Sequence, residues 1–302
     1  MIKNIVLIGE GSHAKKRIIP SLNRTNIKIQ EIYSRKKSIF KFLKNQKKPR
    51  NTFYYICTPP KSHFKIINFL LINKSNVIVE KPAVLKLDHF KIIKKIILRN
   101  TNNIFLENLM YKHSKIFKKF KKHWKNNNKK ILKLEINFLI PDFFKIGFRS
   151  TKLDKFLILH DIGIYPISLL NILDIKILKI EILNHLYLKK KIKKIQIKLK
   201  SQNLEVLINI GEELDYANNI IVSNSNGSKI IFDKIFSGVK SEKKISYIDK
   251  AKKILLIKDH DCFDKFFTFD IGYFKSLKKN NLDLIEKNII LLDRIKSKIK
   301  SN

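Results

Sequence analysis

The sequence is poor in several residue types, and each shortage excludes a class of protein. Its two cysteines, Cys57 and Cys262, lie far apart and match no metal-ligand spacing, so we expect neither a disulfide scaffold nor a metal site. Seven prolines and eight glycines among 302 residues exclude collagen-like and low-complexity architectures. No uncharged apolar run reaches about 18 residues, and the apolar stretch before Gly9 is too short for a signal peptide, so we expect a reduced, cytoplasmic protein that spans no membrane.

Acidic residues are also scarce: 25 Asp and Glu stand against 64 Lys and Arg, which gives a net charge of +39. Such a charge suggests a nucleic acid or an anionic membrane as partner. Only seven of the basic residues are Arg, however, and recognition of phosphates and bases favours Arg. Lys is instead spread through every segment together with Ile and Asn, as a strongly AT-biased coding sequence would produce. We therefore expect no nucleic-acid partner, although the lysine clusters at 118–130 and 189–200 keep a nucleic-acid-binding module as a less favoured alternative.

The length allows two domains, because single cores stop growing at about 250–300 residues. Up to residue 112, short apolar strands alternate with amphipathic helical segments, which predicts a Rossmann-like, doubly wound parallel sheet. The predicted strands are 4–9, 27–34, 52–58, 76–80 and 104–107. The first predicted helix ends near residue 22, and the others cover 36–43, 63–72 and 87–98.

The pattern changes in the second domain, which we assign to residues 113–302. Longer strand-like stretches joined by short turns predict an α+β domain with a large, open and mostly antiparallel sheet. The expected strands are 131–140, 175–188, 192–199, 204–210, 220–223 and 229–232, and the expected helices are 116–124, 162–173, 263–277 and 284–299.

A glycine-rich turn follows the first predicted strand and opens a helix. Its sequence is G-x-G-x-x-A, in which the first glycine permits a tight turn, the second lets the backbone approach a pyrophosphate, and the alanine allows close packing of helix on strand. We therefore predict dinucleotide contacts from the turn that contains Gly9, Gly11, Ser12, His13 and Ala14.

The end of the second strand bears on which dinucleotide is preferred. Strands that select NAD usually end in Asp or Glu, whereas here Ser34 and Arg35 follow Tyr33. A hydroxyl and a guanidinium suit a 2′-phosphate, so we predict NADP(H) as the preferred cofactor, with NAD(H) possible. The alternative is an ordinary basic helix start.

Three further strand ends carry polar or rigid residues. The third strand ends in Thr58-Pro59-Pro60 with His63 nearby, the fourth in Glu80-Lys81-Pro82, and the fifth in a segment from Glu107 to Tyr111. Carboxyl ends of parallel strands line the crevice in which doubly wound sheets bind ligands. We expect Thr58, Pro59, Pro60, His63, Glu80 and Lys81 to contact the cofactor.

Together with the segment His160-Asp161-Ile162-Gly163-Ile164-Tyr165-Pro166, these motifs resemble the Gfo/Idh/MocA oxidoreductase family over most of residues 1–175. The resemblance implies a nicotinamide cofactor, a sugar-like substrate, and a dimer or tetramer formed through the outer face of the C-terminal sheet. It also implies catalytic roles: Lys81 would bind the reacting oxygen, and Asp161 and Tyr165 would act from one helix. Residues i and i+4 share a helix face, so a carboxylate and a phenol at this spacing can address the same substrate.

The segment before Asp161 is similar to the branch that reduces keto groups of nucleotide-linked sugars, because a Pro-ended strand and Phe148-Arg149 precede it. We expect Arg149, Tyr111 and His160 to contact substrate, or cofactor phosphate in the case of Arg149. The glycines that usually precede this Asp motif are replaced by residues 155–159, which reshapes that part of the site. A catalytically inert dinucleotide-binding protein of the same fold is the alternative function.

Overall fold

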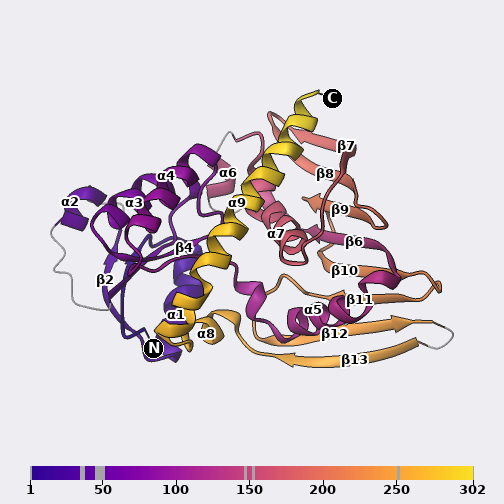
Figure 1. Cartoon of the computed structure of the whole chain (residues 1–302), viewed down its shortest axis with the longest axis horizontal. Coiled ribbons are helices and arrows are strands. Elements are labelled where there is room, and N and C mark those ends of the chain that lie inside the picture. Colours follow the sequence, from indigo (N-terminus) through magenta and orange to yellow (C-terminus); the bar gives the residue numbers. More distant parts are fainter. Residues whose placement is uncertain are drawn as a thin grey trace. The chain divides into compact units, whose positions relative to one another are not determined.

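The computed structural model describes residues 2–34, 38–44, 52–145, 148–151, 154–249 and 252–301 (Figure 1). The chain divides into two compact units: residues 1–109 with 263–289, and residues 110–262 with 290–302. The first boundary lies near the predicted one at 112. The return of residues 263–289 to the first unit was not expected, since an amphipathic helix does not encode which core it covers.

The first unit contains a five-stranded parallel sheet in the order β2-β1-β3-β4-β5. Its strands are β1 (Asn4–Ile8), β2 (Lys28–Tyr33), β3 (Thr52–Ile56), β4 (Asn76–Glu80) and β5 (Phe105–Asn108). Its helices are the π-helical turn Ala14–Ile18, α1 (Ile19–Arg24), α2 (Ile39–Lys44), α3 (Pro60–Ile72), α4 (Leu87–Arg99), α8 (Cys262–Phe267) and the first part of α9 (Ile271–Ser301).

Strands β1, β3, β4 and β5 are almost completely buried, as expected for a parallel sheet covered on both faces, whereas the edge strand β2 is mostly exposed. One core cluster joins strand residues such as Val6 and Ile56 to Ile67 of α3, Phe90 of α4 and Ile285 of α9. Phe267 of α8 and Phe274 of α9 contact aromatic residues that point from β3 to the opposite face. The C-terminal segment thus completes the covering of the sheet.

The second unit contains an eight-stranded sheet in the order β13-β12-β11-β10-β6-β9-β8-β7, in which only the β6–β9 pair is parallel among the described strands. Its strands are β6 (Ile131–Leu139), β7 (Lys179–Leu188), β8 (Lys191–Lys200), β9 (Glu205–Gly211), β10 (Ala217–Asn224), β11 (Lys229–Asp233), β12 (Ser241–Ile248) and β13 (Lys252–Asp259). The predicted fold class, a parallel Rossmann sheet followed by a large, mostly antiparallel sheet, is confirmed. The hairpin of β12 and β13 was not predicted.

Helices cover one face of this sheet (Figure 1). α5 (Lys115–Asn127) contributes Phe120, which contacts Phe232 of β11, and Gly163 lies against Ile210 of β9 just before α7 (Ile164–Ile172). The shorter helices of this unit are the 3₁₀ turns Met110–His113, Asn128–Lys130 and Phe143–Lys145, the helix α6 (Phe148–Thr151) and the π-helical turn Leu159–Gly163.

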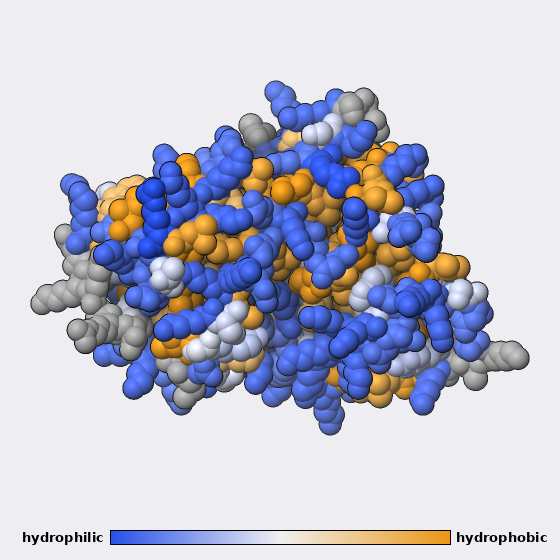
Figure 2. Space-filling model, in the orientation of Figure 1, coloured by the Kyte–Doolittle hydropathy of each residue, from blue (hydrophilic) through white to orange (hydrophobic). Residues whose placement is uncertain are grey.

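The lysine excess is distributed over the surface. Hydrophilic side chains are spread across the visible face in Figure 2 rather than gathered into one patch. On the visible face, this distribution fits solvated side chains better than one dedicated binding patch. Within the described residues, no helix combines the length and apolar character needed to cross a membrane.

Candidate active site

The glycine-rich turn is held tightly between the two neighbouring strands. Gly9 has a φ of +110°, and a Cβ atom there would lie 3.0 Å from the backbone of Cys57 and Thr58. Its N–H donates to the carbonyl of Tyr33, at the end of β2. Both its conformation and the close approach of β3 therefore require glycine at this position.

Of the other predicted contact residues in the turn, three are exposed and Ala14 is buried. Gly11, Ser12 and His13 are exposed, and a Cβ atom at Gly11 would meet nothing within 4 Å. Ala14 is completely buried. Open space beside Gly11, next to a tightly packed Gly9, is an arrangement that admits a pyrophosphate close to the backbone, so the residues present fit a dinucleotide.

The residues expected to select NADP(H) are only partly described. Ser34 follows β2 and is half-buried. Arg35 lies outside the described residues. The preference for a 2′-phosphate therefore stays a prediction.

His63 joins the turns that follow β3 and β4. Its ring is completely buried, with Nε2 2.7 Å from the carbonyl oxygen of Thr58 and Nδ1 2.9 Å from that of Pro82. Burial lowers the pKa of His63, although the two carbonyl groups favour the protonated ring. His63 thus holds these two turns together, and its predicted contact with the cofactor stays a prediction.

Both turns contain proline. Pro59 precedes α3 in an extended conformation and Pro60 is the first residue of that helix. The peptide bond between Lys81 and Pro82 is cis. Lys81 is partly exposed at the carboxyl end of β4. The backbone N–H of Ala83 donates to Glu107 at 2.6 Å, which ties the turn to β5.

A buried polar network lies beneath Lys81. The hydroxyl of Tyr55 donates to Glu80 at 2.5 Å and accepts from the side-chain amide of Asn108 at 2.9 Å. His13 Nε2 lies 3.6 Å from the same carboxylate oxygen of Glu80. Burial tends to raise the pKa of Glu80, but His13, Tyr55 and Lys81 together hold it below its usual range. Glu80 is therefore a carboxylate that links three strands and the glycine-rich turn.

In the second unit, Asp161 lies in the π-helical turn that precedes α7, and Tyr165 lies in the first turn of α7. Both are buried. Arg149 donates from Nε to Asp161 at 2.6 Å, and its guanidinium lies over the ring of Phe143 at 4.3 Å. Arg149, which we expected to contact substrate or a phosphate, is thus paired with the carboxylate of the Asp motif.

Aromatic rings surround Tyr165. Its ring contacts Tyr111, Phe138 and Phe236, with centroids 5.4 to 5.7 Å apart. Tyr111 is completely buried, and its hydroxyl shares a hydrogen bond of 2.8 Å with Ser168 on α7. Tyr111 thus packs beside Tyr165, and its predicted contact with substrate stays a prediction.

His160 is nearly buried next to Asp161. Within the described residues neither ring nitrogen has a hydrogen-bond partner, and the closest carboxylate is that of Asp154, 3.6 Å from Nδ1. Burial lowers the pKa of His160, against the opposing influence of Asp154. The side chain is thus held as a neutral imidazole, and its predicted contact with substrate stays a prediction.

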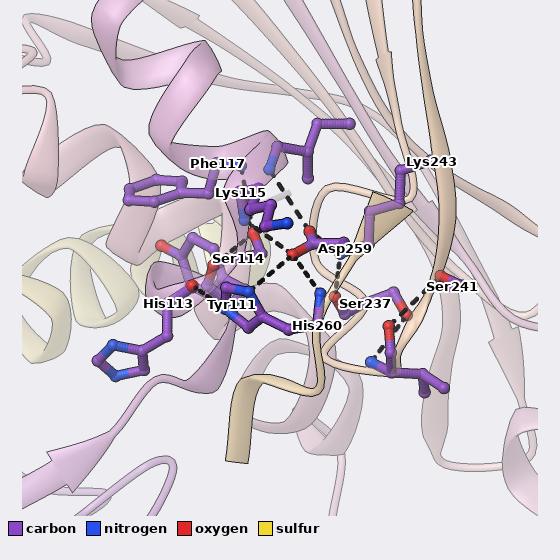
Figure 3. Close-up of polar contacts among 12 residues, drawn as sticks. Tyr111, His113, Ser114, Lys115, Phe117, Ser237, Ser241, Lys243, Asp259 and His260 are labelled. Carbon is purple, nitrogen blue, oxygen red and sulfur yellow. Dashed lines mark hydrogen bonds and ion pairs between the residues drawn. The ribbon is translucent and has the colours of Figure 1, made fainter. Parts of the chain in front are cut away.

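Sequence reasoning missed the carboxylate that anchors the start of α5, next to Tyr111 (Figure 3). Asp259 accepts from the backbone N–H groups of Lys115 and His260, each at 2.9 Å, and from the ammonium of Lys243 at 3.0 Å. Both side chains of the Lys243–Asp259 pair are fully buried. Asp259 therefore fixes the segment that carries Tyr111.

No group of three or more potential metal ligands occurs among the residues that the structure describes. The polar side chains instead form hydrogen bonds at Glu80, next in sequence to Lys81, and at Tyr111, which packs against Tyr165. Such groups suit proton transfer.

The comparisons with known proteins agree with this chemistry. Residues 3–108 match the model of the oxidoreductase family with an NAD-binding Rossmann fold, GFO_IDH_MocA. No curated protein matches the sequence. The resemblance expected from the motifs is confirmed over residues 3–108, which match the NAD-binding domain of this family.

Solved structures match over almost the entire chain. KijD10, a 3-ketoreductase from Actinomadura kijaniata solved with TDP-benzene and NADP in an open conformation, gives a TM-score of 0.81 at 16% identity, covering 98% of this chain and 97% of that chain. A dehydrogenase from Chromobacterium violaceum gives 0.71 at 10% identity, covering 98% and 95%. At these identities the likeness establishes the fold.

Proposed function

We propose that this protein uses NADP(H) to exchange a hydride with a secondary alcohol or ketone of a sugar or nucleotide-linked sugar. The observation that carries this proposal is the presence of Lys81, Asp161 and Tyr165 at the family's motif positions in a chain with the fold of a 3-ketoreductase. The neighbour KijD10 was solved with NADP and TDP-benzene, which supports a nucleotide-linked substrate.

The first unit supplies the binding part of the mechanism. Gly9, Gly11 and the residues that follow would hold the pyrophosphate, and a bound nicotinamide would supply or accept the hydride. The hydrogen bond from Tyr55 to Glu80 and the contacts of His63 with Thr58 and Pro82 hold the turn that carries Lys81. Lys81 would bind the substrate oxygen, and its positive charge stabilises negative charge that develops there.

The second unit supplies the proton. As hydride reaches the carbonyl carbon, the C=O π electrons move to oxygen, and the phenol of Tyr165 would donate its proton to that oxygen to give the alcohol. The aromatic rings packed around Tyr165 would hold its ring in place. Asp161, paired with Arg149, would orient the start of α7.

Two measurements test the proposal. Calorimetry with NADPH and NADH should show binding of both, with tighter binding of NADPH; equal affinities would contradict the preference, and no heat with either would contradict the function. A panel of free and TDP-linked keto-sugars with NADPH should then include one that is reduced. Binding without reduction of any member would favour the inert dinucleotide-binding alternative.

We also propose that copies of the chain associate through the C-terminal sheet. Apolar side chains are exposed on its two edge strands, including Leu183 and Leu186 of β7 and Ile254 and Leu256 of β13. Exposed apolar groups at this density are typical of an interface. Light scattering after gel filtration should give the mass of a dimer or tetramer, and a monomer at micromolar concentration would contradict this.

A further inference from the structure

His13 occupies a special position in the glycine-rich turn. It lies between Ser12 and Ala14, is half exposed, and places Nε2 3.6 Å from Glu80 Oε1. Its ring packs against that of Phe263 of α8 in a T-shaped arrangement, with centroids 5.6 Å apart. An imidazole is therefore held in the turn where a dinucleotide would bind, facing a buried carboxylate.

The carboxylate is well suited to stabilise a positive charge on His13. Glu80 is 8% exposed, and one of its oxygens already accepts from Tyr55. Because its pKa is held below the usual range, Glu80 is negative at neutral pH. A protonated imidazole at 3.6 Å would gain an ion pair that a neutral ring lacks.

Other charged groups lie in the same part of the first unit. Lys81 directly follows Glu80, and Arg17 lies over the ring of Phe263 that also contacts His13. Glu10, in the same turn, is paired with Lys15 at 3.3 Å. Burial raises the pKa of Cys57, whose thiol is thus neutral. Among the described residues, Glu80 is the one carboxylate within ion-pair distance of His13.

A bound pyrophosphate would change the charge around His13. It would bring negative charge to the same turn, and negative charge favours the protonated form of a nearby imidazole. We propose that His13 takes up a proton from solvent when the dinucleotide binds, so that cofactor affinity is coupled to pH through the His13–Glu80 pair. This inference rests on the proposed function, since it requires that a dinucleotide occupies the Gly9–Ala14 turn.

Calorimetry in two buffers with different ionisation enthalpies measures the proton directly. At pH 7 we expect NADPH binding to the intact protein to take up a fraction of a proton, and the affinity to fall several-fold between about pH 6 and pH 8. The 2′-phosphate of NADPH itself titrates near pH 6, so NADH, which lacks it, serves as the second probe.

The variants His13→Gln and Glu80→Gln separate this site from other titrating groups. Glutamine at position 13 can still hydrogen-bond to Glu80 but cannot take up a proton, so uptake should be lost with both NADPH and NADH. Glu80→Gln should reduce uptake while leaving His13 in place. His89→Gln is the matched control, because His89 stacks on Phe64 in the same unit at 3.8 Å and is not part of the turn.

Each outcome decides one question. Binding heat that does not depend on the buffer, or uptake that His13→Gln retains, would overturn the inference while leaving the proposed function intact. Absence of any binding heat in the wild-type protein would overturn the proposed function itself. Circular dichroism of each variant shows whether it folds. If His13→Gln does not fold, loss of proton uptake in Glu80→Gln but not in His89→Gln would still support the proposal.

Discussion

Arg149 and Asp161 form an ion pair in which Nε donates to Oδ2 at 2.6 Å. The arginine side chain is 22% exposed and that of Asp161 is 9% exposed, so the pair is largely shielded from water. Removing one partner of a fully buried pair costs about 3–5 kcal/mol. Because Arg149 keeps some exposure, we expect Arg149→Gln to lower the free energy of unfolding by about 1–3 kcal/mol.

The same variant tests what Arg149 does. If it serves Asp161, Arg149→Gln should reduce kcat and leave the dissociation constant for NADPH within about twofold. Urea unfolding and a fluorescence titration with NADPH measure the two effects. A large loss of NADPH affinity with unchanged stability would instead restore the phosphate contact expected from the sequence.

Lys81 and Tyr165 are the residues on which turnover should depend most. Loss of a group that moves a proton typically costs 10²–10⁴-fold in rate, so we expect Lys81→Ala and Tyr165→Phe each to reduce kcat by about that factor. Tyr165→Phe should leave NADPH affinity unchanged. Lys65→Ala is the control, since Lys65 is an exposed lysine on α3. Steady-state kinetics with the best keto-sugar of the panel would measure these effects, and unchanged turnover in both variants would refute their assignment.

Gly9 and Gly11 should respond differently to the same substitution. Gly9→Ala places a Cβ atom 3.0 Å from the β3 backbone at a φ of +110°, and strained conformations of this kind cost about 1–3 kcal/mol. We therefore expect a lower melting temperature for Gly9→Ala. Gly11→Ala meets open space, so its stability should be unchanged while NADPH affinity falls, because the methyl group would occupy space needed by the pyrophosphate. Equal stability of the two variants would contradict this account.

The sequence predicted the first sheet well, because most of its strands are short apolar runs separated by helical patterns. The hairpin of β12 and β13 escaped prediction for the opposite reason. In β12, apolar residues are few and Lys243 occupies a fully buried position. A lysine in a sequence usually indicates an exposed position. Lys243 can be buried because it pairs with Asp259, sixteen positions later.

At the candidate site, too, local sequence predicts some features and distant contacts determine others. Short motifs such as G-x-G-x-x-A and Glu80-Lys81-Pro82 locate groups that would bind or react, and local spacing suffices to find them. Contacts that hold those groups join distant segments: Asn281 bonds to the backbone of Glu107, and His63 joins Thr58 to Pro82. No local pattern specifies such pairs, because they depend on the packing of the folded chain.

Asp259 should make stability depend on acid. Burial tends to raise its pKa, but the N–H of Lys115 and the ammonium of Lys243 hold the pKa below its usual value. A group whose pKa is lower in the folded state than in the unfolded chain stabilises the fold above the unfolded value of about 3.9, and this contribution is lost as pH falls through the folded value. Urea midpoints at pH 7 and at pH 3 would measure the loss.

Variants of the Lys243–Asp259 pair separate charge from packing. Asp259→Asn leaves a buried ammonium without its counter-charge, so we expect a loss of about 3–5 kcal/mol at pH 7 and a smaller further loss in acid than the wild-type protein shows. Adding Lys243→Met should recover much of that stability, because it removes the uncompensated charge. Asp215→Asn, at an exposed position, is the control and should behave as wild type. Equal unfolding free energies for wild type and Asp259→Asn at pH 7 would show that the pair does not anchor α5.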